Sequence, residues 1–258
     1  MSKTVYISVL EKEENKGKQI FQTVTRYGLT AAGHFWSDNL PEMEWAAPIQ
    51  EMIDPQVGVW VVIGSVKTFE AESVRIGLSL LALALQARKG FKFPIILCPD
   101  DGDLDKASLP TPLADADVVT SAAALGPKLA AKANIPVRPV DLEYRLDLHP
   151  IPKLGLWVAV GPGKGHAWKG ALLGVDDGEI TSHGVGPSGQ VPERCVLNYP
   201  MQGLKLNLSD TEYTAWAVQN ELDDQTSYYC RVYGNAKSFV FGPLPDEDEG
   251  ELFTVKLA

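Results

Sequence analysis

Apolar runs alternate with amphipathic stretches along the first half of the chain. The β-branched and aromatic run TVYISVL (4–10) predicts a strand, and NKGKQIFQTVTRYG predicts a helix because its apolar residues share one face. LTAAGHFW predicts a second strand, and EWAAPIQEMI (44–53) predicts a second helix with Pro48 in its first turn. This order is typical of repeated strand–helix units.

Three further units follow the same order. VGVWVVIG (57–64) and KFPIILC (92–98) are apolar on both faces, as are strands that helices cover on both sides. A long helix is predicted over residues 69–89. ADVVTS (116–121) and the alanine-rich AAALGPKLAAKAN close a fifth unit. The fold class predicted for residues 1–135 is therefore α/β, a five-stranded doubly wound parallel sheet of flavodoxin-like layout.

The pattern changes in the second half of the chain. Four prolines in residues 136–153 indicate an extended connector. From residue 154 to 258, short alternating runs such as LGLWVAVG, EITSHGVG, RCVLNYP and SYYCRVYG are separated by turn residues, which predicts a smaller all-β domain, a sandwich or a barrel. DTEYTAWAVQNEL (210–222) reads as one helix within it. The acidic run DEDEGE (246–251) is expected to be a solvated C-terminal segment.

Composition and charge limit the classes of partner that the protein is expected to bind. The 258 residues are 45% hydrophobic and 22% charged, and the net charge of −10 disfavours binding to nucleic acid or an anionic membrane. The longest apolar run, about 12 residues, is too short to cross a bilayer. The N-terminal stretch enters a strand pattern directly, and three scattered cysteines suit reduced thiols, so a cytoplasmic location is expected.

Established cofactor motifs are missing from the sequence. It contains neither GxGxxG after the first strand nor GxxxxGK[ST], and its four histidines are far apart, so no cofactor and no metal are expected. A phospho-acceptor receiver is excluded because the third strand ends in Gly64-Ser65. Cys195 with His183 is a weak candidate for a nucleophile and base, since no activating motif accompanies the pair.

The switch point of the predicted sheet is the best place for a ligand. Ligands of open α/β sheets bind beyond the carboxyl ends of the strands, where the strand order reverses. Backbone donors before a helix suit an anion, although an ordinary strand-to-helix turn with a Ser or Thr cap is the alternative. The rule places Glu11, to which no role is assigned, beside Gly64 and Ser65. The candidate ligand-binding residues at this edge are Ser8, Trp36, Asp38, Gly64, Ser65, Thr68, Glu70 and Arg75.

Residues 4–99 resemble two related families. YISVL, FWSDNLPEMEWAAPIQEMI and VGVWVVIGSVKTF resemble the first half of Toll/interleukin-1 receptor (TIR) domains, in which a buried strand ends in Ser with an aromatic residue four positions on; Ser65 and Phe69 fit. RIGLSLLALALQARKGFKFPIIL (75–97) is similar to nucleoside deoxyribosyltransferases, whose equivalent helix carries Glu-x-Gly before small apolar residues. In enzymes of both families, that helix glutamate acts at a nucleoside or NAD glycosidic bond.

The chain departs from these families at the residue that matters most for chemistry. Arg75 stands in place of the glutamate, and a cation would destabilise the positive charge that develops as a glycosidic bond breaks. Glu72, one turn earlier, is the nearest carboxylate and the candidate catalytic residue. An i, i+3 ion pair of Glu72 with Arg75 is the alternative.

The sequence therefore favours binding over catalysis. The leading expectation is a TIR-like interaction or sensing protein, at most weakly catalytic, that binds a nucleotide-like small molecule or a protein partner at the cleft beyond the strand carboxyl ends. A hydrolase or transferase acting on an N-glycosidic bond of NAD or a nucleoside is the first alternative. A structural subunit whose β domain mediates homo-oligomer assembly is the second.

Overall fold

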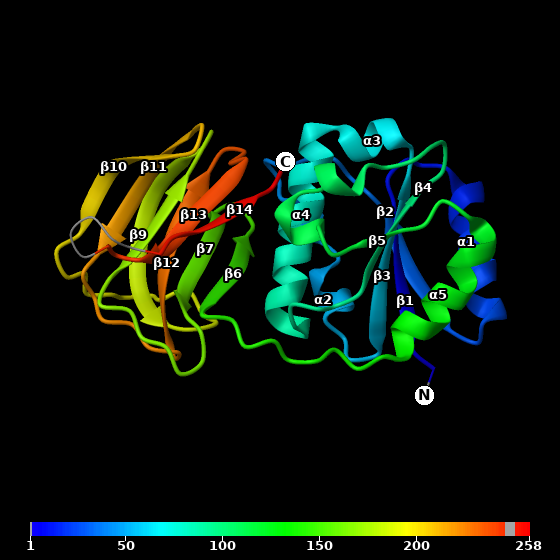
Figure 1. Cartoon of the computed structure of the whole chain (residues 1–258), viewed down its shortest axis with the longest axis horizontal. Helices are drawn as coiled ribbons and strands as arrows, with labels where there is room; N and C mark the ends of the chain where they lie inside the picture. The colour runs from blue at the N-terminus through cyan, green and yellow to red at the C-terminus, as the bar shows by residue number, and fades with distance from the viewer. Residues whose placement is uncertain (1, 246–250) are drawn as a thin grey trace. The chain divides into compact units, whose positions relative to one another are not determined.

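The protein has two compact units, with the boundary between Val140 and Asp141 (Figure 1). The computed structural model describes residues 2–245 and 251–258. Each unit has its own sheets. The first is an α/β unit, and the second is built of β-strands.

The first unit is built on a parallel sheet of flavodoxin-like order. Within the described residues, the strands are arranged β2-β1-β3-β4-β5, and every pairing is parallel. The order reverses at β1, which pairs with both β2 and β3. The five strands are β1 (Thr4–Val9), β2 (Thr30–Phe35), β3 (Val57–Gly64), β4 (Ile95–Pro99) and β5 (Asp117–Val118). The predicted doubly wound sheet is confirmed.

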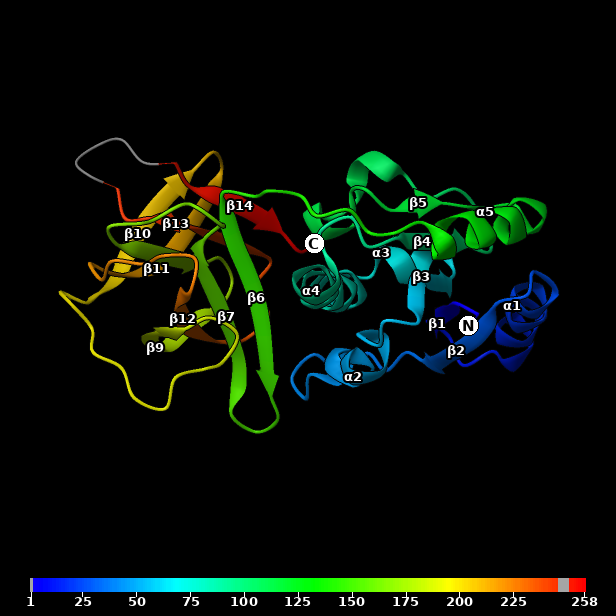
Figure 2. The ribbon, with the colours of Figure 1, turned by 90° about the horizontal axis from the view of Figure 1, so that it is seen from below.

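Helices cover both faces of this sheet (Figure 2). Val24 of α1 and Leu125 and Leu129 of α5 join one core cluster with the alternate residues Val5, Ile7 and Val9 of β1. Helix α4 lies on the opposite face, together with α2 and η1. The helices are α1 (Glu14–Arg26), α2 (Ile49–Met52), α3 (Val66–Glu70), α4 (Glu72–Lys89) and α5 (Ala122–Asn134), with 3-10 turns η1 (Glu44–Ala46), η2 (Lys106–Ser108) and η3 (Thr111–Leu113).

Two predicted helices are interrupted. Residues 44–53 form η1 and then the short α2, with Pro48 as the residue that caps α2. The long helix predicted over residues 69–89 begins earlier, at Val66, and is broken at Ala71, whose extended backbone (φ −62°, ψ 125°) separates α3 from α4. The break makes Glu72 the first residue of α4 and leaves α3 as a separate turn after Gly64-Ser65.

The second unit is a sandwich of two antiparallel sheets. The described strands are arranged β10-β11-β8-β13-β14 in one sheet and β6-β7-β12-β9 in the other. The rings of His183 in β9 and Trp216 in β11 meet between the sheets, with centroids 4.8 Å apart. The strands are β6 (Tyr144–Ile151), β7 (Gly155–Pro162), β8 (Ala171–Val175), β9 (Glu179–Pro187), β10 (Met201–Leu208), β11 (Thr211–Val218), β12 (Thr226–Tyr233), β13 (Ser238–Pro243) and β14 (Phe253–Lys256).

The helix predicted over residues 210–222 is wrong, because this segment forms strand β11. Tyr213, Ala215 and Ala217 are buried on one face of the strand, while Trp216 faces His183 across the sandwich. The apolar residues therefore follow a period of two, and pairing with β8 and β10 on either side decides the structure.

The predicted connector is shorter than its prolines indicate. Strand β6 occupies the second half of residues 136–153 and pairs with β7 along its whole length. RCVLNYP forms no strand, whereas the segment after the acidic run supplies β14. Most of that run, residues 246–250, lies outside the described residues. Across the described chain, no helix has both the length and the apolar character needed to cross a bilayer.

Candidate functional site

The carboxyl ends of β1 and β3 lie side by side at the point where the strand order reverses. The amide of Leu10 donates to the carbonyl of Ile63 at 2.8 Å, and the amide of Asp100, after β4, donates to the carbonyl of Gly64 at 3.1 Å. These bonds carry the sheet one residue beyond the strands. Glu11 is thereby placed opposite Ser65, and Asp100 beside Gly64.

Glu11 accepts the polar donors of the turn after β3. Its Oε1 accepts the backbone N–H of Ser65 at 2.9 Å, the hydroxyl of Ser65 at 2.8 Å and the hydroxyl of Thr68 at 2.6 Å. The Ser65 Oγ in turn accepts the backbone N–H of Thr68 at 3.2 Å and so caps α3. The donors that the sequence assigned to an external anion are therefore bonded to a carboxylate of the same chain.

The second oxygen of Glu11 is enclosed. Oε2 is buried and has no hydrogen-bond partner among the described residues. It lies against Gly64, where a Cβ would come within 3.1 Å of Oε2 and within 2.9 Å of the Cβ of Leu10. Only glycine fits at position 64, because any side chain there would displace the Glu11 carboxylate.

The Glu11 carboxyl group is held in its charged form. Burial raises its pKa, but hydrogen bonds from Thr68 and Ser65 and the charge of Lys16 outweigh burial, and the pKa of Glu11 is lowered. A carboxylate with one oxygen bonded by three donors is charged at neutral pH.

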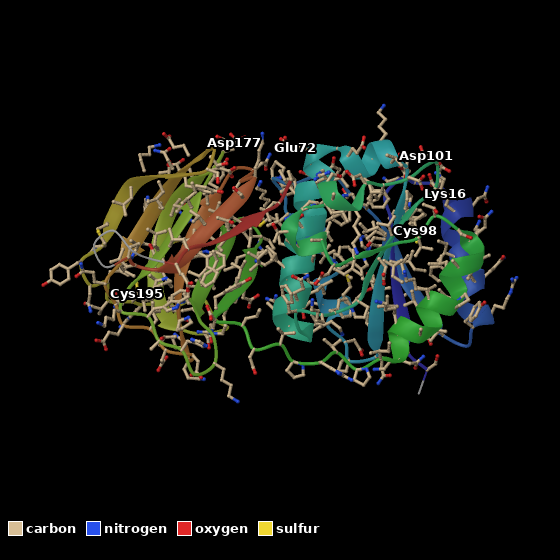
Figure 3. All side chains as sticks on the ribbon, viewed as in Figure 1. Lys16, Glu72, Cys98, Asp101, Asp177 and Cys195 are labelled. Carbon is tan, nitrogen blue, oxygen red and sulfur yellow. The ribbon has the colours of Figure 1, made fainter. Side chains whose placement is uncertain are left out.

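Further charged groups lie at this end of the sheet, and Figure 3 labels two of them, Lys16 and Asp101. Lys16 of α1 forms ion pairs with Glu13 at 3.1 Å and with Asp100 at 2.6 Å. The carboxylate of Asp101 accepts the backbone N–H of Val66, the first residue of α3, at 2.7 Å. The edge is therefore rich in carboxylates, several of which hold the loops in place.

Ser8 and Trp36 lie on the other face of the sheet from α1 and α5. Ser8 is fully buried and accepts the indole N–H of Trp60 at 2.9 Å. Trp36 is 5% exposed and packs against Gly77 of α4, where a Cβ would lie 2.8 Å from its ring. Both residues, predicted to bind ligand, are therefore enclosed in the protein core and are not among the residues that bond to Glu11.

The remaining predicted residues lie around the start of α4. The hydroxyl of Ser73 donates to the carboxylate of Asp38 at 2.6 Å. The guanidinium of Arg75 donates to the backbone carbonyl of Ser108, at the end of η2. Glu70 and Glu72 are exposed. The structure thus brings Gly64, Ser65 and Thr68 together around Glu11, which the sequence placed at this edge without assigning it a role.

Nucleophile and metal candidates gain no support. His183 contacts Trp216 and Tyr228 inside the sandwich, whereas the Sγ of Cys195 lies 3.2 Å from where Gly184 would carry a Cβ, on the opposite face of β9. A Cys195–His183 pair is therefore excluded. No group of three or more His, Cys, Asp or Glu side chains within residues 2–245 and 251–258 is arranged to hold a metal ion.

Comparison with known proteins supplies no relative from which a function could be transferred. No protein-family model matches the chain, and no curated protein is similar to it at a significant level. The flavodoxin-like order of the first sheet is compatible with the resemblance to TIR domains and nucleoside deoxyribosyltransferases and does not distinguish these families from others with the same order. The function therefore has to be argued from the site.

Proposed function

We propose that the protein is a non-catalytic interaction or sensing module. Its TIR-like α/β unit binds a basic protein segment beyond the carboxyl ends of the parallel strands. The observation that carries the proposal is the occupation of the Ser65 and Thr68 donors by Glu11. An anionic ligand such as a phosphate would have to break three bonds to an internal carboxylate before it could bind there. The edge therefore favours a cationic partner.

The charges around Glu11 support this choice of partner. Carboxylates gather after three neighbouring strands, β1, β3 and β4; most of these residues are exposed, Glu11 is partly buried, and lysines are interspersed among them. We call these carboxylates the acidic rim: Glu11, Glu13, Glu70, Asp100, Asp101, Asp103 and Asp105. Exposed charges of this kind steer association and set specificity more than they add affinity. A Lys- or Arg-rich segment would be attracted both by the acidic rim and by the net charge of −10.

The start of α4 supports binding over N-glycosidic chemistry. Arg75 stands where the enzymes that residues 4–99 resemble carry their glutamate, and its guanidinium donates to the carbonyl of Ser108. A carboxylate is needed to stabilise the cationic centre of such a reaction or to attack it. In the enzymatic alternative, Glu72 would have to supply that group from the exposed first turn of α4.

Titration of the full chain with a fluorescent oligolysine peptide tests the proposal, with oligoglutamate as the probe of opposite charge. We expect oligolysine to bind and oligoglutamate not to bind. The affinity for oligolysine should fall steeply as salt is raised, because the charges involved are exposed. Absence of oligolysine binding at low salt would contradict the proposal.

Charge-reversal variants locate the binding site. Glu70→Lys and Asp103→Lys each change two charge units on the acidic rim and should weaken oligolysine binding several-fold. Asp115→Lys is the matched control, because Asp115 precedes β5, at the amino ends of the strands, and forms an exposed ion pair with Lys92 at 2.5 Å. Equal losses in all three variants would show that net charge, and not the rim, governs binding.

Incubation with NAD and a panel of nucleosides tests the enzymatic alternative separately. We expect no turnover. Turnover that Glu72→Ala abolishes and Arg75→Ala leaves intact would establish the N-glycosidic alternative, whatever the result with oligolysine.

A further inference from the structure

Two buried nitrogen atoms on β2 and at its end have no hydrogen-bond partner among the described residues. They are Nδ1 of His34 and Nε1 of Trp36. Trp36 is 5% exposed, so its indole N–H is enclosed by protein. A buried polar group left without a partner costs about 1–3 kcal/mol, and groups of this kind in native proteins are usually satisfied by protein or by ordered water.

The two nitrogens belong to one cluster of rings. His34 and Trp36 are two residues apart on an extended segment, so their side chains project from the same face. Their ring centroids are 6.1 Å apart, and the ring of Tyr6 in β1 lies 5.7 Å from that of His34. The hydroxyl of Tyr6 donates to Glu51 of α2 at 3.0 Å, so the cluster lies between the sheet and α2.

A second indole on the same face provides a direct contrast. Trp60 of β3 is fully buried, and its Nε1 donates to the hydroxyl of Ser8 at 2.9 Å. The fold therefore satisfies one buried indole N–H of this face with a protein oxygen. The corresponding atom of Trp36 meets none among the described side chains and backbone.

We propose that His34 and Trp36 form a buried site for one small uncharged oxygen ligand, which is a water molecule in the isolated chain. An indole N–H only donates, so the guest must present an acceptor to Trp36. The guest donates to Nδ1 of His34, which fixes His34 as the neutral tautomer with its proton on Nε2. Water fits because it is small enough to occupy a confined polar site and satisfies both nitrogens.

The charges around the cluster disfavour an ionic guest. The carboxylate of Glu51 acts on His34 from α2, which disfavours an anion beside it. Burial lowers the pKa of His34 more than Glu51 raises it, so the ring is held neutral and supplies no charge to bind an ion. A neutral guest with one acceptor and one donor is the chemistry that remains.

A crystal structure of the full chain at high resolution tests this site directly. We expect electron density for a water within about 3.2 Å of both Nε1 of Trp36 and Nδ1 of His34. The Nε1 of Trp60 should have Ser8 as its partner and no water. In Trp36→Phe, which removes the donor and keeps an aromatic ring, the water density should be lost.

A solution measurement makes the test independent of crystals and of the folding of that variant. Nitrogen-15 NMR of the wild-type chain should show His34 as the tautomer with its proton on Nε2. The proposal would be overturned if the crystal showed no water density at Nε1 of Trp36 and Nδ1 of His34. A His34 ring with its proton on Nδ1 would overturn it as well. Neither result depends on whether the acidic rim binds a basic segment.

Discussion

The carboxylate of Glu11 and the hydroxyl of Ser65, 54 residues apart in the sequence, meet at 2.8 Å beyond the carboxyl ends of β1 and β3. Flavodoxin-like sheets commonly bind a ligand at this point. Here an internal carboxylate bonds to the backbone N–H and hydroxyl of Ser65 and to the hydroxyl of Thr68. The contact joins the loop after β1 to the turn before α3 and gives the edge an acidic character.

Glu11→Gln should destabilise the protein by about 1–3 kcal/mol, because it replaces three charge-assisted hydrogen bonds with weaker ones. Urea unfolding of the full chain at pH 7 measures the change. Glu13→Gln is the matched control, since Glu13 is 56% exposed and pairs with Lys16 at the surface. Its loss should stay below about 1 kcal/mol. Equal losses in the two variants would contradict the role assigned to Glu11.

The contribution of Glu11 should disappear in acid. Its pKa is lowered in the folded protein, so the stabilisation is present above the unfolded pKa, about 4.3 for a glutamate, and is lost as the pH falls through the folded value. The stability difference between wild type and Glu11→Gln should be constant from pH 6 to 8 and shrink below about pH 4. A difference that grows in acid would contradict the direction of the shift.

Two helical glycines should respond in opposite directions to substitution by alanine. In Gly77→Ala, the new Cβ would lie 2.8 Å from the ring of Trp36, so we expect a loss of about 1–3 kcal/mol from overpacking. In Gly17→Ala, the Cβ would meet Val9 at an ordinary 3.6 Å. Higher helix propensity should then stabilise α1 by up to about 1 kcal/mol. Thermal unfolding of both variants measures the contrast, and stabilisation by both would show that Trp36 has room to move.

The three cysteines should differ sharply in reactivity. Burial raises the pKa of Cys98 and of Cys230 to about 12, whereas Cys195 is exposed. A thiol reacts as its thiolate. Titration with a thiol reagent should therefore modify one cysteine per native chain, Cys195, and all three in denaturant. Native labelling of Cys98 in Cys195→Ser would contradict the buried place of Cys98 at the end of β4.

Arg145 should be the most sensitive charged residue of the β unit. Its guanidinium donates to the backbone carbonyls of Pro162 at 2.8 Å and Thr226 at 2.6 Å, and to the hydroxyl of Ser227 at 3.2 Å. Lysine cannot reproduce this fork of donors, so Arg145→Lys should cost about 2–3 kcal/mol. Chemical unfolding, followed by the aromatic near-UV signal, measures the loss.

A surface lysine of the same unit is the control for Arg145. Lys205 pairs with Glu212 at 3.0 Å, with more than half of each side chain exposed. Lys205→Ala should therefore change stability by at most about 1 kcal/mol. A comparable loss in both variants would mean that the carbonyl contacts of Arg145 contribute little.

The sequence predicted the parallel sheet well because each buried strand carries its own signal. Val57–Gly64 and Ile95–Pro99 are apolar throughout, which happens where helices cover both faces. The segment that forms β11 is ambiguous in sequence, because Tyr213, Trp216 and Ala217 have the i, i+3, i+4 spacing of a helix face, while Tyr213, Ala215 and Ala217 alternate as on a strand. The hairpin with β10 and the pairing with β8, which is distant in the sequence, decided between the two.

The arrangement of the residues at the switch point was predicted in part, whereas their role in binding stays a prediction. The switch-point rule correctly placed Glu11 beside Gly64 and Ser65. That Glu11 itself would accept the Ser65 and Thr68 donors depends on the conformations of two loops, which no sequence spacing specifies. Ser8 was expected at the edge, but the alternation along β1 directs it to the α4 side, where Trp60 uses its hydroxyl as an acceptor.

Chemical-shift mapping tests the central proposal, binding at the acidic rim, most directly. The nitrogen-15-labelled full chain is titrated with oligolysine, and the amide shifts are followed residue by residue. We predict that the largest changes fall in residues 10–16, 65–70 and 100–105, which surround Glu11 at the carboxyl ends of the strands. The amide shifts of residues 54–57 and 114–117, at the amino ends of the strands, should change little. Shift changes confined to those amino ends or to the β unit would contradict the proposal.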